Sequence, residues 1–449
     1  MRKLSWLLAV FMVTSLVSTP SAYAFAPVEG GAFNDPRPYG TQTQRYEIIR
    51  RIERAIEATP RAVEGQPRPE ILISTYLLDR RASVAALIAA CERGVSVRVI
   101  MDEGIGTGIS KRLIQALNSD NVDDADGDGV ADAEPTSGPC GAPLPGSRQR
   151  RATQQPTRLS DRQARRSVDV PSGESVTWGG DRSYVTVCTG TCRGGKGNMH
   201  SKFFAFSRTG RASNVITVSS SNLNRGGALN GWNDSYTMVN RPASYQVYRQ
   251  VHREMTADRR TDGTLTEIVD GPFTSRFFPI RRGGMANDPT LKDLNRIRCR
   301  SDFGRTKIFI SMFFWEGVRG EYLADKVLGL ARDGCKVSII LGAPSIAIAQ
   351  RLRAAAREGR IVLWDSRTDV NGDGDRELRT HCKYVLVKGA YGGDRSSFQV
   401  MTGSMNWGNG SLTRSDETSL NIARRSAYAE YLANWHAIRK HSRRIPAPR

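Results

Sequence analysis

One short pattern of residues occurs twice in this chain. Each copy reads H-x-K, an apolar run, a polar loop, a second apolar run and then S-x-N; the copies begin at His200 and His381. On a β-strand residues i and i+2 share a face, so each histidine stands beside the lysine two positions later. The repeated pattern predicts the same β-hairpin in both halves of the chain and restricts the fold to a duplicated one.

The segments before each copy also correspond. The predicted order is strand, helix, strand in both halves, over residues 70–78, 81–91 and 95–101, and again over residues 307–315, 321–332 and 335–341. Gly94 and Gly334 follow the two helices, at positions where a left-handed cap is needed. These patterns predict an α/β fold built from two similar units.

The composition along the chain suggests a division into parts. Residues 119–180 are rich in Pro, Gly, Ser, Asp and Arg and are interpreted as a polar surface insertion. The expected parts are a signal peptide over 1–24, a first half over 25–241, a linker region over 242–295 and a second half over 296–449.

The N-terminus has the features of a secretory signal peptide. Arg2 and Lys3 precede an apolar run over residues 4–17, and small residues end at Ala24. A membrane anchor is the alternative, but the run is short for a bilayer span. We expect cleavage before Phe25 and secretion to the extracellular space.

The formal charge of the chain is +20, and loss of Arg2 and Lys3 lowers it to +18. This excess favours anionic partners, such as phospholipid or another phosphodiester, an anionic membrane surface or nucleic acid. Charge alone does not choose among them, and single basic clusters also serve to solvate a surface. We expect the protein to be a monomer.

Seven cysteines are present, so in an exported protein some should pair and at least one should stay free or pair between chains. Cys188 and Cys192 are close enough in sequence to close a small loop before the first H-x-K. A zinc site with His200 is the alternative, but the second half supplies no matching cysteine pair.

Two acidic stretches place oxygen donors around a turn glycine, as a hard cation requires. The predicted structural calcium ligands are Asp124, Asp126, Asp128 and Asp132 in one stretch, and Asp369, Asn371, Asp373 and Glu377 in the other. A solvated acidic turn is the alternative for each, because neither has a glutamate at the twelfth position of a calcium loop.

Two histidines with two lysines provide a route to phosphate chemistry. One histidine can attack phosphorus to form a phosphohistidine, which divides one difficult displacement into two steps. The other can protonate the leaving alkoxide and then deprotonate water. Lysine, asparagine and serine side chains offer donors to the oxygens that gain charge, so no metal or other cofactor is expected in catalysis.

The paired H-x-K and G-S-x-N elements resemble those of the phospholipase D superfamily, above all secreted bacterial members. The resemblance implies two α/β/α sandwich halves related by pseudo-twofold symmetry, with the active site at their interface. It also implies an orienting acid about ten residues after each asparagine. Carried onto this chain, the half-sites are His200, Lys202, Ser220, Asn222 and Asp234, and His381, Lys383, Ser404, Asn406 and Glu417.

The chain departs from that family pattern at three positions. The aspartate five residues after each lysine is replaced by Ser207 and Lys388, and the glycine of the first G-S-x-N is Ser219. The aspartate is credited with holding the structure around the site. Trp232, Trp407, Phe314 and Trp315 are candidates for a substrate groove, with core packing as the alternative.

The resemblance favours a secreted phosphoric diester hydrolase, a phospholipase D that releases the head group of a phospholipid to leave phosphatidic acid and can transfer the phosphatidyl group to alcohols. It also favours His200 as the nucleophile and His381 as the acid/base. A nuclease acting on DNA or RNA is the first alternative, because the charge would serve it equally well. An inactive polyanion-binding homologue is the second.

Overall fold

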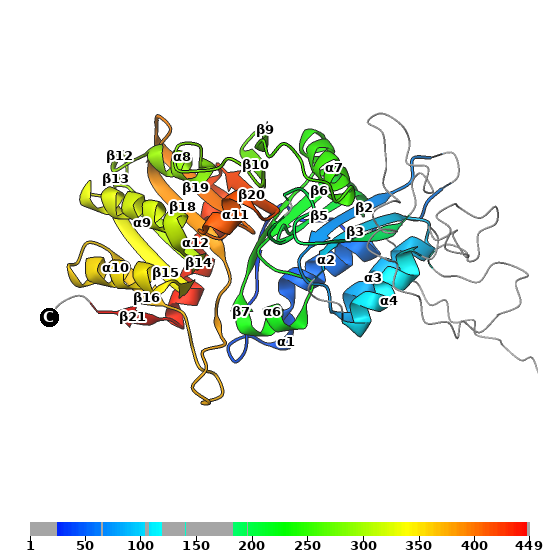
Figure 1. Cartoon of the computed structure of the whole chain (residues 1–449), viewed down its shortest axis with the longest axis horizontal. Coiled ribbons are helices and arrows are strands. Elements are labelled where there is room, and N and C mark those ends of the chain that lie inside the picture. Colours follow the sequence, from blue (N-terminus) through cyan, green and yellow to red (C-terminus); the bar gives the residue numbers. More distant parts are fainter. Residues whose placement is uncertain are drawn as a thin grey trace, which may run out of the picture.

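A computed structural model shows two α/β lobes side by side, the N-terminal half in blue to green and the C-terminal half in yellow to red (Figure 1). The structure describes residues 25–63, 66–103, 107–118, 140, 183–194 and 196–446. The predicted insertion over 119–180 therefore lies outside the described residues, apart from Cys140.

The first half is a seven-stranded sheet with helices on both faces. Its strands run in the order β1 (Gly30–Phe33), β8 (Asp234–Met238), β6 (Ala212–Ser219), β5 (Phe203–Thr209), β2 (Glu70–Thr75), β3 (Ser96–Asp102) and β4 (Tyr184–Cys188). The last three are parallel and the others antiparallel. One face packs on α2 (Glu47–Glu57), α3 (Arg81–Glu92) and α4 (Gly108–Asn118), and the other on α7 (Pro242–Thr256).

The second half repeats this order strand for strand. Its series is β10 (Phe273–Phe278), β20 (Glu417–Ile422), β19 (Asp394–Gly403), β18 (Lys383–Tyr391), β14 (Lys307–Trp315), β15 (Lys336–Pro344) and β16 (Val362–Asp365), with β9 (Thr266–Asp270) and β21 (Arg443–Ile445) at the edges. One face packs on α9 (Gly317–Arg332) and α10 (Ile346–Arg357), and the other on α12 (Arg425–Lys440).

A single hydrophobic cluster joins the halves. It combines Tyr248 of α7 and Phe203 of the first sheet with Tyr384 of the second sheet and Tyr431 of α12. The two lobes thus share apolar packing across their interface.

The remaining short elements are α1 (Gln42–Arg45), α6 (Arg225–Asn230), α8 (Pro289–Asn295), α11 (Asn409–Thr413), β7 (Gly231–Trp232), β11 (Ile297–Arg298), β12 (Arg300–Ser301), β13 (Gly304–Arg305) and β17 (Arg379–Thr380).

The predicted duplication and the α/β fold are confirmed. The strands and helices expected from periodicity are present as β2, α3 and β3 and as β14, α9 and β15. Gly94 and Gly334 take φ values of +83° and +98°, the left-handed conformation expected after each helix.

The predicted linker over 242–295 differs from what the structure contains. Its first part is α7, which packs on the first sheet, and its later part includes β10, which pairs with β20 in the second sheet. Apolar side chains at alternate positions, such as Phe273 and Phe277, give β10 a buried face despite the polar average of the stretch.

The cysteines form three disulfides in the described part of the chain: Cys91–Cys140, Cys188–Cys192 and Cys299–Cys335. Cys382 is free and buried, so the expectation that at least one cysteine does not pair within the chain is confirmed. Within the described ranges, no helix has the length and apolar character that a membrane span requires.

A buried arginine ties α9 to the loop after β19. Arg319 is 1% exposed and donates from Nε and Nη2 to the Asp288 carboxylate at 2.8 and 3.1 Å. Its Nη1 donates to the Asn406 carbonyl at 2.8 Å. The Arg319–Asp288 ion pair therefore holds the second S-x-N segment, which contains Asn406, in place from the core side.

Replacing this arginine should destabilise the protein strongly. Arg319→Ala leaves the carboxylate of Asp288 buried without its main partner, so we expect a loss of about 3–5 kcal/mol in the free energy of unfolding. The matched control is Arg351→Ala, because Arg351 and Asp325 form an exposed pair worth about 0–1 kcal/mol. Urea titration followed by circular dichroism measures both, and equal losses would contradict the expectation.

Candidate active site

The two H-x-K motifs lie at the interface, and the opposite half holds the backbone of each. His200 precedes β5, and its backbone N–H donates to the Asp416 carbonyl of the second half at 3.0 Å. His381 precedes β18, and its N–H donates to the Trp232 carbonyl of the first half at 2.8 Å. The site therefore forms only where the two lobes meet.

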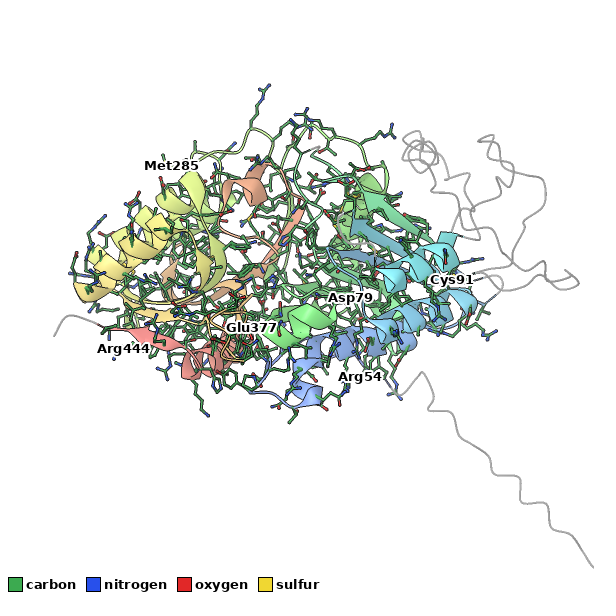
Figure 2. The ribbon with its side chains drawn as sticks, turned by 60° about the horizontal axis from the view of Figure 1, so that its bottom comes forward. Arg54, Asp79, Cys91, Met285, Glu377 and Arg444 are labelled. Atoms are coloured by element: carbon green, nitrogen blue, oxygen red, sulfur yellow. A yellow bond between two sulfur atoms is a disulfide. The ribbon has the colours of Figure 1, made fainter. Side chains whose placement is uncertain are left out.

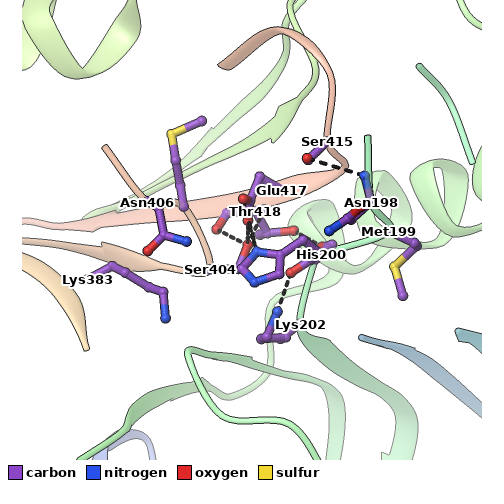
Figure 3. A network of polar contacts seen from close by, with 12 residues as sticks. Asn198, Met199, His200, Lys202, Lys383, Ser404, Asn406, Ser415, Glu417 and Thr418 are labelled. Carbon is purple, nitrogen blue, oxygen red and sulfur yellow. Dashed lines mark hydrogen bonds and ion pairs between the residues drawn. The ribbon is translucent and has the colours of Figure 1, made fainter. Parts of the chain in front are cut away.

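Each imidazole ring is also bound by the opposite half. His200 Nδ1 lies 3.0 Å from both carboxylate oxygens of Glu417, and Figure 3 shows the ring beside this carboxylate. His381 Nδ1 lies 2.8 Å from Asn233 Oδ1. Asn233 Nδ2 donates to the carbonyls of Gly227 and Gly231, so its oxygen faces the ring. Both rings then donate from Nδ1, and Nε2 of each carries a lone pair.

The prediction that Asp234 orients a histidine ring is wrong by one residue. In each half the motif serine donates its backbone N–H to the adjacent strand, to the Asp234 carbonyl in the first half and the Thr418 carbonyl in the second. Asn233 is thus the counterpart of Glu417. Because side chains alternate along a strand, Asp234 points away from the ring that Asn233 meets.

Asp234 lies fully buried behind the site. Its carboxylate accepts hydrogen bonds from Thr402 and from Tyr431, the latter at 3.2 Å. Burial raises the pKa of Asp234. The side chain belongs to the shared interface rather than to the group of residues around the two rings.

The two lysines are as buried as core residues. Lys202 and Lys383 are 0% and 3% exposed, and each Nζ donates to the carbonyl of its own motif histidine. Burial lowers the pKa of both lysines to about 7, against an opposing effect of the Glu417 carboxylate. Near neutral pH these ammonium groups are therefore easily discharged, and an added negative charge would favour their protonated form.

The predicted serines support the ring partners. Ser404 Oγ donates to Glu417, and Ser220 Oγ donates to Asn233 Oδ1 at 3.4 Å. The serines therefore position the groups that orient the histidines.

The predicted asparagines hold the ends of the central strands. Asn222 Oδ1 accepts from Leu77 N at 3.3 Å, and Asn406 Oδ1 accepts from Phe314 N at 3.2 Å. Neither Nδ2 group has an acceptor among the described residues, so both remain available to a ligand oxygen.

Two aromatic rings beside the histidines were not predicted. The Tyr76 ring centroid lies 5.4 Å from that of His200, and the Phe313 centroid lies 4.6 Å from that of His381. They occupy equivalent places at the ends of β2 and β14, so the internal repeat carried the signal for them. Of the predicted groove candidates, three are buried in the core: Trp232, Trp315 and Trp407.

The positions that lost the family aspartate lie far from the rings. Ser207 and Lys388 are five residues along their strands from the motif lysines, about 16 Å at 3.3 Å per residue. Ser207 Oγ accepts from Glu70 N at 2.7 Å, and Lys388 Nζ lies 4.9 Å from the Phe303 ring centroid. The substitutions therefore alter support at the far strand ends and leave the reaction centre in place.

The substitution of glycine by serine in the first motif has a local reason. Gly403 has φ +134°, and a Cβ there would lie 2.2 Å from the Thr418 carbonyl oxygen. Ser219 does not adopt a positive φ, and its Oγ donates to the Asp234 carbonyl at 2.8 Å. Only the second half requires glycine at this position.

The second acidic stretch forms a loop before β17, with Glu377 labelled in Figure 2. Carboxylate oxygens of Asp369, Asp373 and Glu377 lie within 4.8 Å of one another. Asn371 Nδ2 donates to Asp373 at 2.8 Å, and backbone N–H groups lower the pKa of Asp369. Calcium binding here stays a prediction. The stretch from Asp124 to Asp132 lies outside the described residues.

The charges around the two rings are unequal. Burial lowers the pKa of His200, while the Glu417 carboxylate raises it. Burial lowers the pKa of His381 well below its usual value, and Lys383, Lys202, His200 and Arg379 add to this effect. Lys202 and Lys383 lower the pKa of both rings, so the two histidines share one set of charged neighbours.

Comparison with known proteins identifies the sequence pattern. Residues 65–258 and 303–438 match the domain profile described as "Cardiolipin synthase, PLD-like domain". No curated protein matches the chain by sequence.

Among solved structures, phosphatidylserine synthase from Haemophilus influenzae Rd KW20 aligns with 12% identity and a TM-score of 0.51, over 92% of this chain and 87% of that one. At this identity the likeness shows the fold alone. Polyphosphate kinase from Porphyromonas gingivalis aligns with 13% identity and a TM-score of 0.48 over 96% of this chain, which spans 50% of that protein. Nuc from Salmonella typhimurium, a phospholipase D family member, aligns with 17% identity and a TM-score of 0.28 over 39% of this chain and 98% of its own.

Asn233→Asp should raise the pKa of His381. A carboxylate at 2.8 Å from Nδ1 stabilises the imidazolium form that the neutral amide leaves unsupported, and we expect a rise of about 1–3 units. Titration of the ring Cε1–H signal by NMR measures it. Glu417→Gln is the matched change at the other ring and should lower the pKa of His200. An unmoved His381 signal in folded Asn233→Asp protein would show that the amide is not a determinant.

Proposed function

Because this chain belongs to the phospholipase D superfamily, we propose that it is a phosphodiesterase that releases phospholipid head groups and transfers the remaining phosphatidyl group to water or to alcohols. The observation that carries the proposal is the crossed pairing of the rings, His200 with Glu417 and His381 with Asn233. It leaves two Nε2 atoms with lone pairs at one interface, as a two-step displacement on phosphorus requires.

The unequal partners support His200 as the nucleophile. A phosphohistidine carries positive charge on its ring for the lifetime of the intermediate, and the Glu417 carboxylate stabilises that charge. The acid/base must instead release its proton to the leaving oxygen and regain one from water. His381, bound to a neutral amide, holds a proton less firmly and suits the second role.

A bound substrate offsets the positive charge of the two lysines at the site. The resting site places Lys202 and Lys383 beside His381 and lowers its pKa. A bound phosphodiester adds negative charge, which favours protonation of all three groups. The lysines and the free amide groups of Asn222 and Asn406 are then donors to the phosphoryl oxygens in the transition state. No step of this scheme uses a metal.

Exposed apolar side chains beside the site favour a lipid substrate over nucleic acid. Phe314, which donates to Asn406, is 37% exposed, and Val318 and Ile346 are 65% and 78% exposed. Val318 and Ile346 begin helices at the same sheet edge, where Ser345 N donates to Trp315 O. An apolar rim suits a membrane surface better than a nucleic acid backbone.

We also propose that the protein acts outside the cytoplasm, after removal of residues 1–24. The three disulfides support this, because such bonds persist in oxidising compartments. A chain with a +18 formal charge would there meet anionic membrane surfaces.

The substrate class is tested with purified protein in EDTA. We expect release of head group from mixed phospholipid vesicles and little nicking of supercoiled plasmid, because the apolar rim lies beside the site. Head-group release is measured by mass spectrometry and nicking by gel electrophoresis. Nicking without head-group release would favour the nuclease, and salt-sensitive binding without either activity would favour the inactive homologue.

The roles of the histidines are tested separately. His200→Ala and His381→Ala should each lower turnover by at least about 10³-fold, since nucleophile and acid/base are lost in turn. With labelled substrate, a phosphoenzyme should accumulate in His381→Ala and be absent in His200→Ala. His436→Ala is the control, because His436 lies on α12 outside the site. A label found on His381 in the His200→Ala protein would reverse the assignment.

A further inference from the structure

The surroundings of His200 and His381 differ at a second position, besides the exchange of Glu417 for Asn233. Arg379 lies two residues before His381, whereas the equivalent position before His200 is Asn198. In an extended chain residues i and i+2 share a face, so Arg379 lies on the same side as His381 and Lys383. An additional cation is therefore present at the His381 end alone.

The Arg379 guanidinium is partly buried and stacks beside the site. Its Cζ lies 5.2 Å from the Phe313 ring centroid, and that ring lies 4.6 Å from the His381 ring. Burial and the charge of Arg367 lower the pKa of Arg379. Its charge also contributes to the lowered pKa of His381, two residues along the chain.

No described residue accepts a hydrogen bond from this guanidinium or forms an ion pair with it. The neighbouring Arg367 differs, because it donates to both oxygens of Asp365 at 2.9 and 2.8 Å. A partly buried cation without an anion is costly unless a ligand supplies one. Its planar fork matches a carboxylate or phosphate group.

The backbone holds Arg379 in a fixed place. β17 pairs with β7 of the other half, with Arg379 opposite Gly231. A Cβ at Gly231 would lie 3.2 Å from the Cβ of His381, so the strands pack closely at this point. A guanidinium on such a rigid support is preorganised for a ligand.

The two substitutions make the ends opposite in charge. Glu417 and the neutral Asn198 lie at the His200 end, and Arg379 and the neutral Asn233 lie at the His381 end. In the proposed reaction the leaving group departs beside His381. Resting on that proposed function, we propose that Arg379 binds a second anionic group, a carboxylate or phosphate, carried by the leaving head group of the substrate.

A binding experiment tests the subsite without turnover. O-phospho-L-serine and phosphoethanolamine differ by one carboxylate, and calorimetry compares their affinities for the full protein. We expect the first to bind about tenfold more tightly, the effect of one charge-assisted hydrogen bond. Arg379→Gln should remove this preference and Arg379→Lys should keep part of it. Comparing the affinities of glycerol 1,3-bisphosphate and glycerol 3-phosphate tests in the same way whether the second anionic group is a phosphate.

Arg367→Gln is the matched control, because it removes the same charge at a neighbouring, already paired position and should keep the preference. Hydrolysis of monomeric dihexanoyl phosphatidylserine and phosphatidylethanolamine then tests turnover. A preference in binding without hydrolysis would refute the proposed function and leave the subsite standing. Equal affinities for the two ligands, or a preference unchanged in Arg379→Gln, would overturn the subsite.

Discussion

The hydrogen bonds that cross between the halves determine the site more than any other interaction. Each histidine has its backbone N–H and its ring Nδ1 bound by the opposite lobe, so neither lobe contains a correctly oriented ring by itself. The apolar cluster shared by α7 and α12 keeps the lobes together. The geometry of the reaction centre consequently depends on the stability of the interface, because a shift between the lobes would misplace both rings at once.

Burial gives the site its electrostatic character. Lys202 and Lys383 are nearly inaccessible, and Glu417 is the carboxylate that affects both. Excess positive charge in a low-dielectric interface is unfavourable in the empty site and favourable once phosphate oxygens enter. In the proposed function, the binding of a diester thereby favours the protonated forms of the groups that act on it. Arg319 holds the second S-x-N loop from the core side and so keeps the Asn406 donor in place.

The sequence predicted the parts of the fold that depend on local periodicity. Repeated strands, the hairpins after each H-x-K and the glycine caps at Gly94 and Gly334 all follow from residue spacing. The ring partner of His381 was mispredicted because an acid was expected there; the spacing itself identifies Asn233, which lies eleven residues after Asn222 as Glu417 lies eleven residues after Asn406. The linker was also mispredicted, since β10 pairs with the neighbouring β9 and joins the second sheet through β20, a distant segment.

Duplication explains why the differences between the halves are informative. A duplication first places the same residues around both rings, so identical surroundings of the two histidines would need no explanation. Here an amide faces His381 where a carboxylate faces His200, and Arg379 stands where the other copy has Asn198. In the proposed two-step displacement the two rings have different roles, because one carries a persistent positive charge while the other exchanges a proton with the leaving group and with water. The differences between the two copies therefore support the roles proposed for His200 and His381.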